Sequence, residues 1–226
     1  MECTCCGTCC RNGPPGLHLE DAPLYAEGVL DKSHLLTLRQ GEPVWDNVAG
    51  RVITLSREMV RLQSDPGTGA CILLQGENHC RIYARRPLQC RALKCWDTSD
   101  LERIYCRNRA GRLDLVPEES ALAEIIGQHE RECPLQDLRE TVDRLRREGG
   151  GEASARIGSL LQRDRWFRDY LRKHAGADEA VLCFILGTPV EEILLRMGIS
   201  AEEAEDELRL REMRPVSRCV SKSVGQ

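Results

Sequence analysis

The chain has 226 residues, a formal net charge of −4 and 41% hydrophobic residues, but only 4% aromatic residues. This length suits one domain or two small ones with a mainly aliphatic core. The slightly acidic balance excludes a uniformly basic nucleic-acid-binding protein. A membrane span needs about 18 apolar residues, and the best candidate, Val181 to Leu186, is far shorter, so no transmembrane helix is predicted.

Cysteine is abundant, with 13 residues in the chain. The sequence opens Met1-Glu2-Cys3 with no apolar run before the cysteines, so no secretory signal is predicted. We therefore expect a cytoplasmic, reducing environment. There, closely spaced cysteines are more often metal ligands than disulfides.

The N-terminal segment is predicted to be mostly irregular. Residues 1–16 contain few branched apolar side chains and end in Pro-Pro-Gly, which is typical of loop. Residues 31–40 contain three leucines and are followed by Gly41, which predicts a short helix. The apolar positions of residues 51–63 fit neither helical nor strand periodicity.

A short β-hairpin is predicted next. Aspartate, proline and glycine in residues 65–69 indicate a turn. Residues 70–75 form an apolar run that predicts a buried strand, residues 76–78 a second turn, and residues 80–84 the returning strand.

Two short helices should follow the hairpin. Pro87 suits the first position of a helix, because its missing N–H costs nothing there. This helix would carry Cys90 and place Cys95 just beyond its end. Ser99 and Glu102 have the spacing of a capping box and predict another short helix through the residues that follow.

The C-terminal half has helical periodicity. Residues 117–130 and 134–148 predict two helices, and the glycines at 149–151 a linker. Residues 188–198 predict a helix that begins at a threonine-proline pair and ends at a glycine, and Ser200 with Glu203 would begin another.

The predicted fold class is therefore α+β. A cysteine-cluster metal-binding domain, residues 1–112, would be an irregular region with a short β-hairpin and helices. A helical region, residues 113–226, would follow as a small bundle.

The first cysteine cluster has the pattern Cys-x2-Cys-x2-Cys-Cys at Cys3, Cys6, Cys9 and Cys10. A two-residue gap lets two thiolates turn toward one ion, and Gly7 relaxes the backbone inside one gap. Zinc usually takes four ligands in a tetrahedron. Because adjacent side chains point apart, some of these thiolates should reach a second metal or share ligands with the second cluster.

The second cluster comprises Cys71, Cys80, Cys90 and Cys95. Its wide spacings suit ligands from a strand pair and the helix that follows. A position near a helix start lowers a thiol pKa and favours the thiolate that binds metal.

The segment around the second cluster is basic, with nine Arg or Lys against three acids between Arg81 and Arg112. Four thiolates on a divalent ion leave a charge of −2, which nearby cations could offset while donating hydrogen bonds. Contacts to nucleic-acid phosphates are the alternative, but no recognition helix or aromatic stacking pattern accompanies them. The first interpretation is favoured, with these cations as candidates: Arg81, Arg85, Arg86, Arg91 and Lys94.

The order and spacing of both clusters, together with Tyr83, Arg86-Pro87 and Arg91 inside the second cluster, resemble the CxxCxxCC cysteine-cluster (YkgJ-like) family over about residues 1–96. Its members are zinc- or iron-chelating proteins, most of them with no assigned reaction. Flagellin lysine methylases have a similar cysteine pattern, which keeps an enzymatic function open. The resemblance implies eight metal ligands: Cys3, Cys6, Cys9, Cys10, Cys71, Cys80, Cys90 and Cys95.

Simpler interpretations exist for individual residues. The eight cysteines could be disulfides or unliganded thiols, which the expected compartment disfavours. Cys5 is out of phase with the motif and is expected to be a spare thiol, and His79 a solvated turn residue. The other cysteines are expected to be ordinary residues: Cys106, Cys133, Cys183 and Cys219.

Several enzyme classes are disfavoured. A radical-SAM motif, Cys-x3-Cys-x2-Cys, fails because Asn12 and Gly13 occupy the third position in the two candidate frames. No phosphate-binding Gly-Lys-Ser/Thr loop and no HExxH helix are present.

Three hypotheses follow. The first, which is favoured, is a structural or chelating module that holds zinc or iron, including an iron–sulfur cluster, and serves a protein partner. The second is an iron-containing redox protein or enzyme. The third is a nucleic-acid-binding module that uses residues 81–112.

Overall fold

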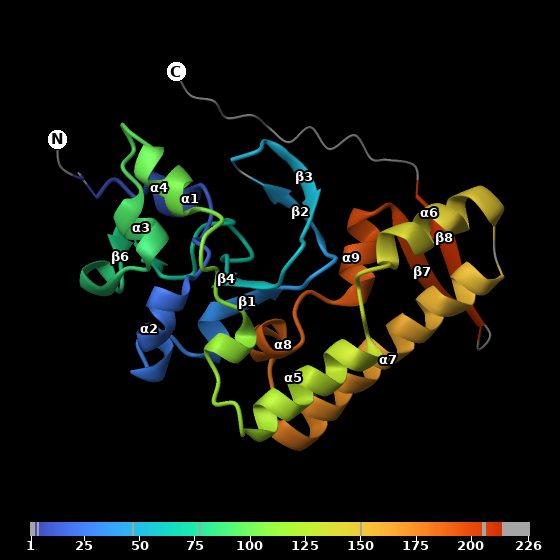
Figure 1. The fold of residues 1–226 in the computed structure, drawn as a ribbon. Coiled ribbons are helices and arrows are strands. Elements are labelled where there is room, and N and C mark those ends of the chain that lie inside the picture. Colours follow the sequence, from blue (N-terminus) through green and yellow to red (C-terminus); the bar gives the residue numbers. More distant parts are fainter. Residues whose placement is uncertain are drawn as a thin grey trace.

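The computed structural model describes residues 3, 5–46, 48–76, 78–149, 151–204 and 207–213. Figure 1 shows the short elements that carry cysteines gathered at one end of the molecule and the longer helices at the other. The helices are α1 (Thr8–Arg11), α2 (Ala22–Ala26), α3 (Leu88–Ala92), α4 (Ser99–Ile104), α5 (Ala121–Glu132), α6 (Leu138–Glu148), α7 (Glu152–Ala175), α8 (Glu179–Ile185) and α9 (Val190–Arg196).

The strands form separate antiparallel pairs, and the fold is α+β as predicted. In the described residues no sheet has more than two strands. The pairs are β1 (Leu35–Leu38) with β4 (Met59–Leu62), β2 (Pro43–Asp46) with β3 (Arg51–Thr54), β5 (Leu74–Gln75) with β6 (His79–Cys80), and β7 (Ile199–Ala204) with β8 (Glu207–Glu212).

The predicted helix at residues 31–40 is wrong. A single 3-10 turn, Lys32–His34, is capped by Asp31 and leads directly into β1. The Thr37 hydroxyl donates a hydrogen bond to the Phe184 carbonyl at 2.7 Å, and α8 packs on this strand. Tertiary packing therefore overrides the local helical pattern. Residues 51–63, whose periodicity was ambiguous, contain β3 and β4.

The predicted helix beginning at Ser200 is also wrong, because this segment is β7. Gly198, with a φ of +81°, ends α9 as predicted. Ile199 then enters the core, only 1% exposed, and pairs with Glu212 of β8. A capping-box pattern is local, so it carries no information on a partner strand later in the chain.

The hairpin around the second cysteine cluster is shorter than predicted. Residues 70–75 contribute only the two residues of β5, and residues 80–84 only the last residue of β6. The predicted helix at Cys90 is confirmed as α3, with Pro87 immediately before it. The predicted helix after Ser99 is present as α4, but Ser99 is its first residue and the predicted capping box is not formed: Thr98 precedes the helix without a side-chain cap bond, and its hydroxyl donates to the Glu102 carboxylate instead.

The long helices agree better with the prediction. Residues 117–130 correspond to α5, which Ser120 caps, and residues 134–148 to α6. The glycine linker at 149–151 separates α6 from α7. No helix in the described part of the chain is long and apolar enough to cross a membrane.

One continuous hydrophobic core contains residues of both halves, with Leu35, Val60 and Leu73 in the same cluster as Ile157 and Phe184. A shared core does not test whether residues 1–112 fold on their own, so the domain boundary predicted after residue 112 stays a prediction.

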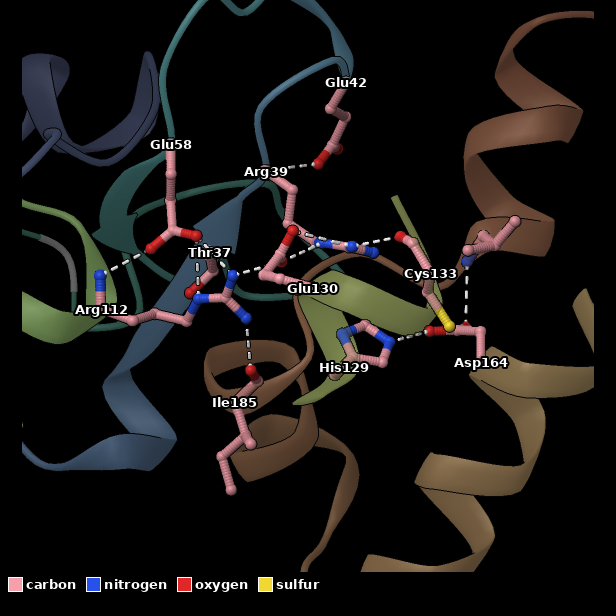
Figure 2. Close-up of polar contacts among 12 residues, drawn as sticks. Thr37, Arg39, Glu42, Glu58, Arg112, His129, Glu130, Cys133, Asp164 and Ile185 are labelled. Atoms are coloured by element: carbon pink, nitrogen blue, oxygen red, sulfur yellow. Dashed lines mark hydrogen bonds and ion pairs between the residues drawn. The ribbon is translucent and has the colours of Figure 1, made fainter. Parts of the chain in front are cut away.

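A buried ionic cluster also joins the halves (Figure 2). Arg39, after β1, donates from Nε and Nη2 to the two carboxylate oxygens of Glu130 in α5. Arg112 donates to Glu130, to Glu58 before β4 and to the carbonyl of Ile185 in α8. Both arginine side chains are fully buried. Burying two cations is costly unless carboxylates accompany them, so this cluster holds the surrounding elements in one arrangement.

Candidate metal centre

Backbone contacts bring the two cysteine clusters together. The Cys71 N–H donates to the Cys10 carbonyl at 2.8 Å. On the other side, Arg11 Nη2 donates to Asn78 Oδ1 at 2.7 Å, which ties α1 to the β5–β6 turn. Gly7 has a φ of +73°, and a Cβ there would lie 2.9 Å from Asn78 Oδ1. Glycine is therefore required where the first cluster approaches the second.

Buried polar groups fix α3, which carries Cys90. Asp21, only 1% exposed, accepts hydrogen bonds from the N–H groups of Leu88 at 2.8 Å and His18 at 3.0 Å. Gln89 Oε1 accepts from the Gly16 N–H at 2.9 Å, and Gln89 Nε2 lies 3.0 Å from His18 Nε2. The helix start is thus anchored to the segment that follows the first cluster.

We expect Asp21→Ala to lower the free energy of unfolding by about 2–4 kcal/mol, because it leaves one buried and one partly buried N–H group unpaired at about 1–3 kcal/mol each. Urea unfolding followed by circular dichroism would measure this. Glu20→Ala is the matched control, since Glu20 is exposed and accepts a long bond from Asn108, and its effect should stay below about 0.5 kcal/mol. Equal effects of the two changes would contradict the anchoring role.

Seven of the eight predicted ligands line one cavity of about 340 Å³, and Cys71 is the exception. The cavity also contains Tyr83, Arg86 and Trp96. Its cysteines come from the N-terminal segment, β6, α3 and the residues after α3: Cys3, Cys5, Cys6, Cys9, Cys10, Cys80, Cys90 and Cys95.

Cys71 lies on the other side of the same thiols. It is buried and lines a second cavity of about 530 Å³, whose remaining wall is mainly aliphatic, with Leu62, Leu73 and Leu101 among its residues. Four cysteines line both cavities and so form a wall of thiols between them: Cys9, Cys10, Cys80 and Cys90. The structure therefore brings all eight predicted residues to one region, while their role as ligands stays a prediction.

Three of the thiols around the two cavities, Cys10, Cys71 and Cys90, resist ionisation in the absence of a cation. Burial, together with the charge of Cys9, raises the pKa of Cys10 to about 12. Burial also raises the pKa of Cys71 and of Cys90. The expectation that the start of α3 would lower the pKa of Cys90 is therefore wrong, because burial outweighs the helix start. Cys3 differs, since the Cys5 N–H donates to its sulfur at 3.4 Å and lowers its pKa. A bound cation would favour the thiolates that these neighbours disfavour, so metal binding should displace protons.

The donor set fits zinc or iron, both of which accept thiolate ligands. In the described residues, however, no group of three or more Cys, His, Asp or Glu side chains is already arranged to hold an ion. The sulfur atoms of Cys9 and Cys10 lie 3.9 Å apart, and the Cys6 thiol donates to the Thr8 hydroxyl. Side-chain rotation would thus have to bring the donors onto a metal.

The sequence prediction missed some of the cavity's residues. Cys5, expected to be a spare thiol, lines the same cavity as the motif cysteines. Trp96 also lines it, and its position next to Cys95 was the available signal. His79 is exposed in β6 and is not among the residues lining either cavity.

The cysteines outside the two clusters lie apart from this wall. Cys106 is exposed, Cys133 is buried beside α5, and Cys183 lies in α8. Cys219 lies outside the described residues. Every cysteine that the structure describes is a free thiol.

Thiols from distant segments, gathered around one cavity, define the class of the protein as a metal-binding cysteine-cluster domain. Comparison with protein families agrees: the CxxCxxCC family model, described as "Putative zinc- or iron-chelating domain", matches residues 2–133. The match covers more than half of the chain, which therefore belongs to this family. No curated protein and no solved structure shows significant similarity to the chain.

The family match extends further than the resemblance seen in the sequence, which covered about residues 1–96. It ends at Cys133, directly after α5. The additional segment contains Arg112 and Glu130, so it contributes the middle of the buried ionic cluster.

Proposed function

We propose that this protein chelates zinc or iron, as single ions or an iron–sulfur cluster, through its eight motif cysteines. It would act in the cytoplasm as a structural or chelating module, or as an accessory to a protein partner. The observation that carries the proposal is the cavity lined by seven motif cysteines with Cys71 directly behind them.

The position of each thiol suggests a division of roles. Cys3, Cys6 and Cys95 are exposed and line only the smaller cavity. Cys71 is buried and lines only the larger one, and Cys90 belongs to the shared wall. The exposed thiols would capture an incoming ion, and the wall would retain it.

Metal analysis with an absorption spectrum, on protein purified without oxygen, tests the proposal. We expect bound zinc or iron in the wild type and the loss of most of it in Cys90→Ser, because a wall ligand is removed. Cys133→Ser is the matched control: Cys133 is equally a free thiol but lies outside the cavities, so metal content should be unchanged. Wild-type protein without metal, or equal metal content in both variants, would sink the proposal.

An iron–sulfur redox protein or enzyme, including methylase-like chemistry, is the second candidate. The observation that favours it is the space beside the thiols, since structural zinc sites are closed whereas reactive centres keep an open side. Iron with visible absorbance that bleaches on reduction would favour this candidate, and colourless zinc would favour the first.

The nucleic-acid hypothesis ranks third. Arg112 is buried in the ionic cluster, and Arg85 and Lys94 pair with Glu27 and Asp100. These pairings reduce the charge available for phosphates. A titration with RNA or DNA at low and high salt would test it.

A further inference from the structure

One positively charged side chain that lines the smaller cavity, Arg86, has an N–H group without a hydrogen-bond acceptor. Among the described residues that line it, Arg86 is the only one that carries a formal positive charge, and none carries a carboxylate. Its guanidinium carbon lies 3.7 Å from the centre of the Tyr83 ring, a cation–π contact. Arg86 Nε is buried and has no hydrogen-bond partner. A buried N–H without an acceptor is rare in proteins and calls for an explanation.

The other cations of the basic segment are engaged elsewhere. Arg81 contacts His34, Arg85 pairs with Glu27, and Lys94 pairs with Asp100. Arg91 donates from Nη1 to the Arg86 carbonyl at 2.6 Å and so fixes the backbone that presents Arg86. Of the five cations that the sequence suggested, Arg86 is the one that faces the thiols.

The charge of the metal-bound site determines which kind of acceptor can pair with the Arg86 Nε–H. The cavity wall is made mostly of thiols, which become thiolates when they bind a metal. A divalent ion with four thiolates has a net charge of −2, and a single arginine leaves the site still negative. A second anion from solution would be repelled, whereas a metal-bound sulfur would be stabilised by this donor.

We propose that Arg86 is a positioning residue of the metal centre, whose Nε–H donates a hydrogen bond to a metal-bound cysteine sulfur while the Tyr83 ring holds the guanidinium in place. This inference rests on the proposed function. It adds a residue that sets the strength and electronic character of the centre without touching the metal.

Titration with Co²⁺ alone tests the inference, because cobalt reports thiolate ligation through its charge-transfer absorption. Arg86→Gln should keep the wild-type number of bound ions but bind them about tenfold or more weakly in competition with a chelator. Its sulfur-to-cobalt band should move to lower energy, since the thiolate loses a donor. Arg86→Lys keeps the charge but lacks Nε–H, so it should recover part of the affinity and leave the band shifted.

Arg85→Gln is the matched control, since Arg85 is the preceding residue, is exposed and pairs with Glu27. Its affinity and spectrum should equal those of the wild type. The inference is overturned if folded Arg86→Gln or Arg86→Lys shows wild-type affinity and band position. Should Arg86→Gln fail to fold, Arg86→Lys alone decides. Wild-type protein that binds no Co²⁺, Zn²⁺ or iron would instead overturn the proposed function.

Discussion

Replacing Glu130 by glutamine is expected to lower the free energy of unfolding by about 3 kcal/mol at pH 7. Glu130 accepts from Arg39 and Arg112, whose side chains are fully buried. Glutamine would fill a similar volume but leave two buried guanidinium groups with less compensating charge. Removing one partner of a buried ion pair costs about 3–5 kcal/mol, far more than the loss of a surface pair.

The same cluster predicts a pH dependence. Burial alone would raise the pKa of Glu130, but the hydrogen bonds and charges of Arg39 and Arg112 outweigh it and hold the pKa at about 2. A carboxyl whose folded pKa is depressed stabilises the fold above its unfolded pKa of about 4.3, and this contribution is lost as the pH falls toward the folded value. The difference between wild type and Glu130→Gln should therefore be full at pH 7 and shrink between about pH 4.5 and pH 2.

Urea unfolding at a series of pH values would measure both effects. Glu132→Gln is the control, because Glu132 lies on the same helix and pairs with the exposed Arg163. That change should cost less than about 1 kcal/mol at every pH. If Glu130→Gln were no more destabilising than Glu132→Gln, the ionic cluster would not have the role assigned to it.

Metal removal should have a large but local effect. The first cluster is held to the second by the Cys71–Cys10 hydrogen bond and the Arg11–Asn78 contact, with little regular structure around them. Because metal binding and folding are coupled in thiolate sites, we expect chelation to speed amide exchange in residues 5–16 and 71–96 by about tenfold or more. Protection in α5, α7 and α9 should change little, since neither these helices nor the ionic cluster contains any of the eight motif cysteines.

Hydrogen exchange with mass spectrometry, before and after treatment with a chelator, would distinguish the two regions within one sample. The helices act as the internal control. Uniform protection in both states would falsify the idea that metal joins the two cysteine clusters.

The fold could be predicted where local pattern and tertiary packing agree. The helical periodicity of residues 134–148 identified α6, and Pro87 located the start of α3. Residues 31–40 and Ser200 were misassigned because their surroundings decide their structure. Thr37 bonds to a carbonyl of α8, and Ile199 pairs with a strand that follows it. Neither partner can be recognised from a short window of sequence.

The candidate site was easier to predict than the fold around it. Cysteine spacing identifies candidate thiols whatever secondary structure carries them. The eight residues could therefore be named although the β5–β6 hairpin was predicted to be longer than it is. Sequence could not separate Arg86 from Arg85, since the two are adjacent and identical in type. Only the folded chain shows that Arg85 points to Glu27 and Arg86 to the cavity.

Two hydrogen bonds that leave the family domain have a consequence for relatives of different length. Arg112 and Thr37 lie within the matched residues, yet they donate to the carbonyls of Ile185 and Phe184, which lie beyond them. A chain that stopped after α5 would lose both acceptors and uncover one side of β1. The later helices therefore complete the domain in the way that a second subunit completes a protomer. Relatives that lack them would need another surface, or different residues at positions 37 and 112.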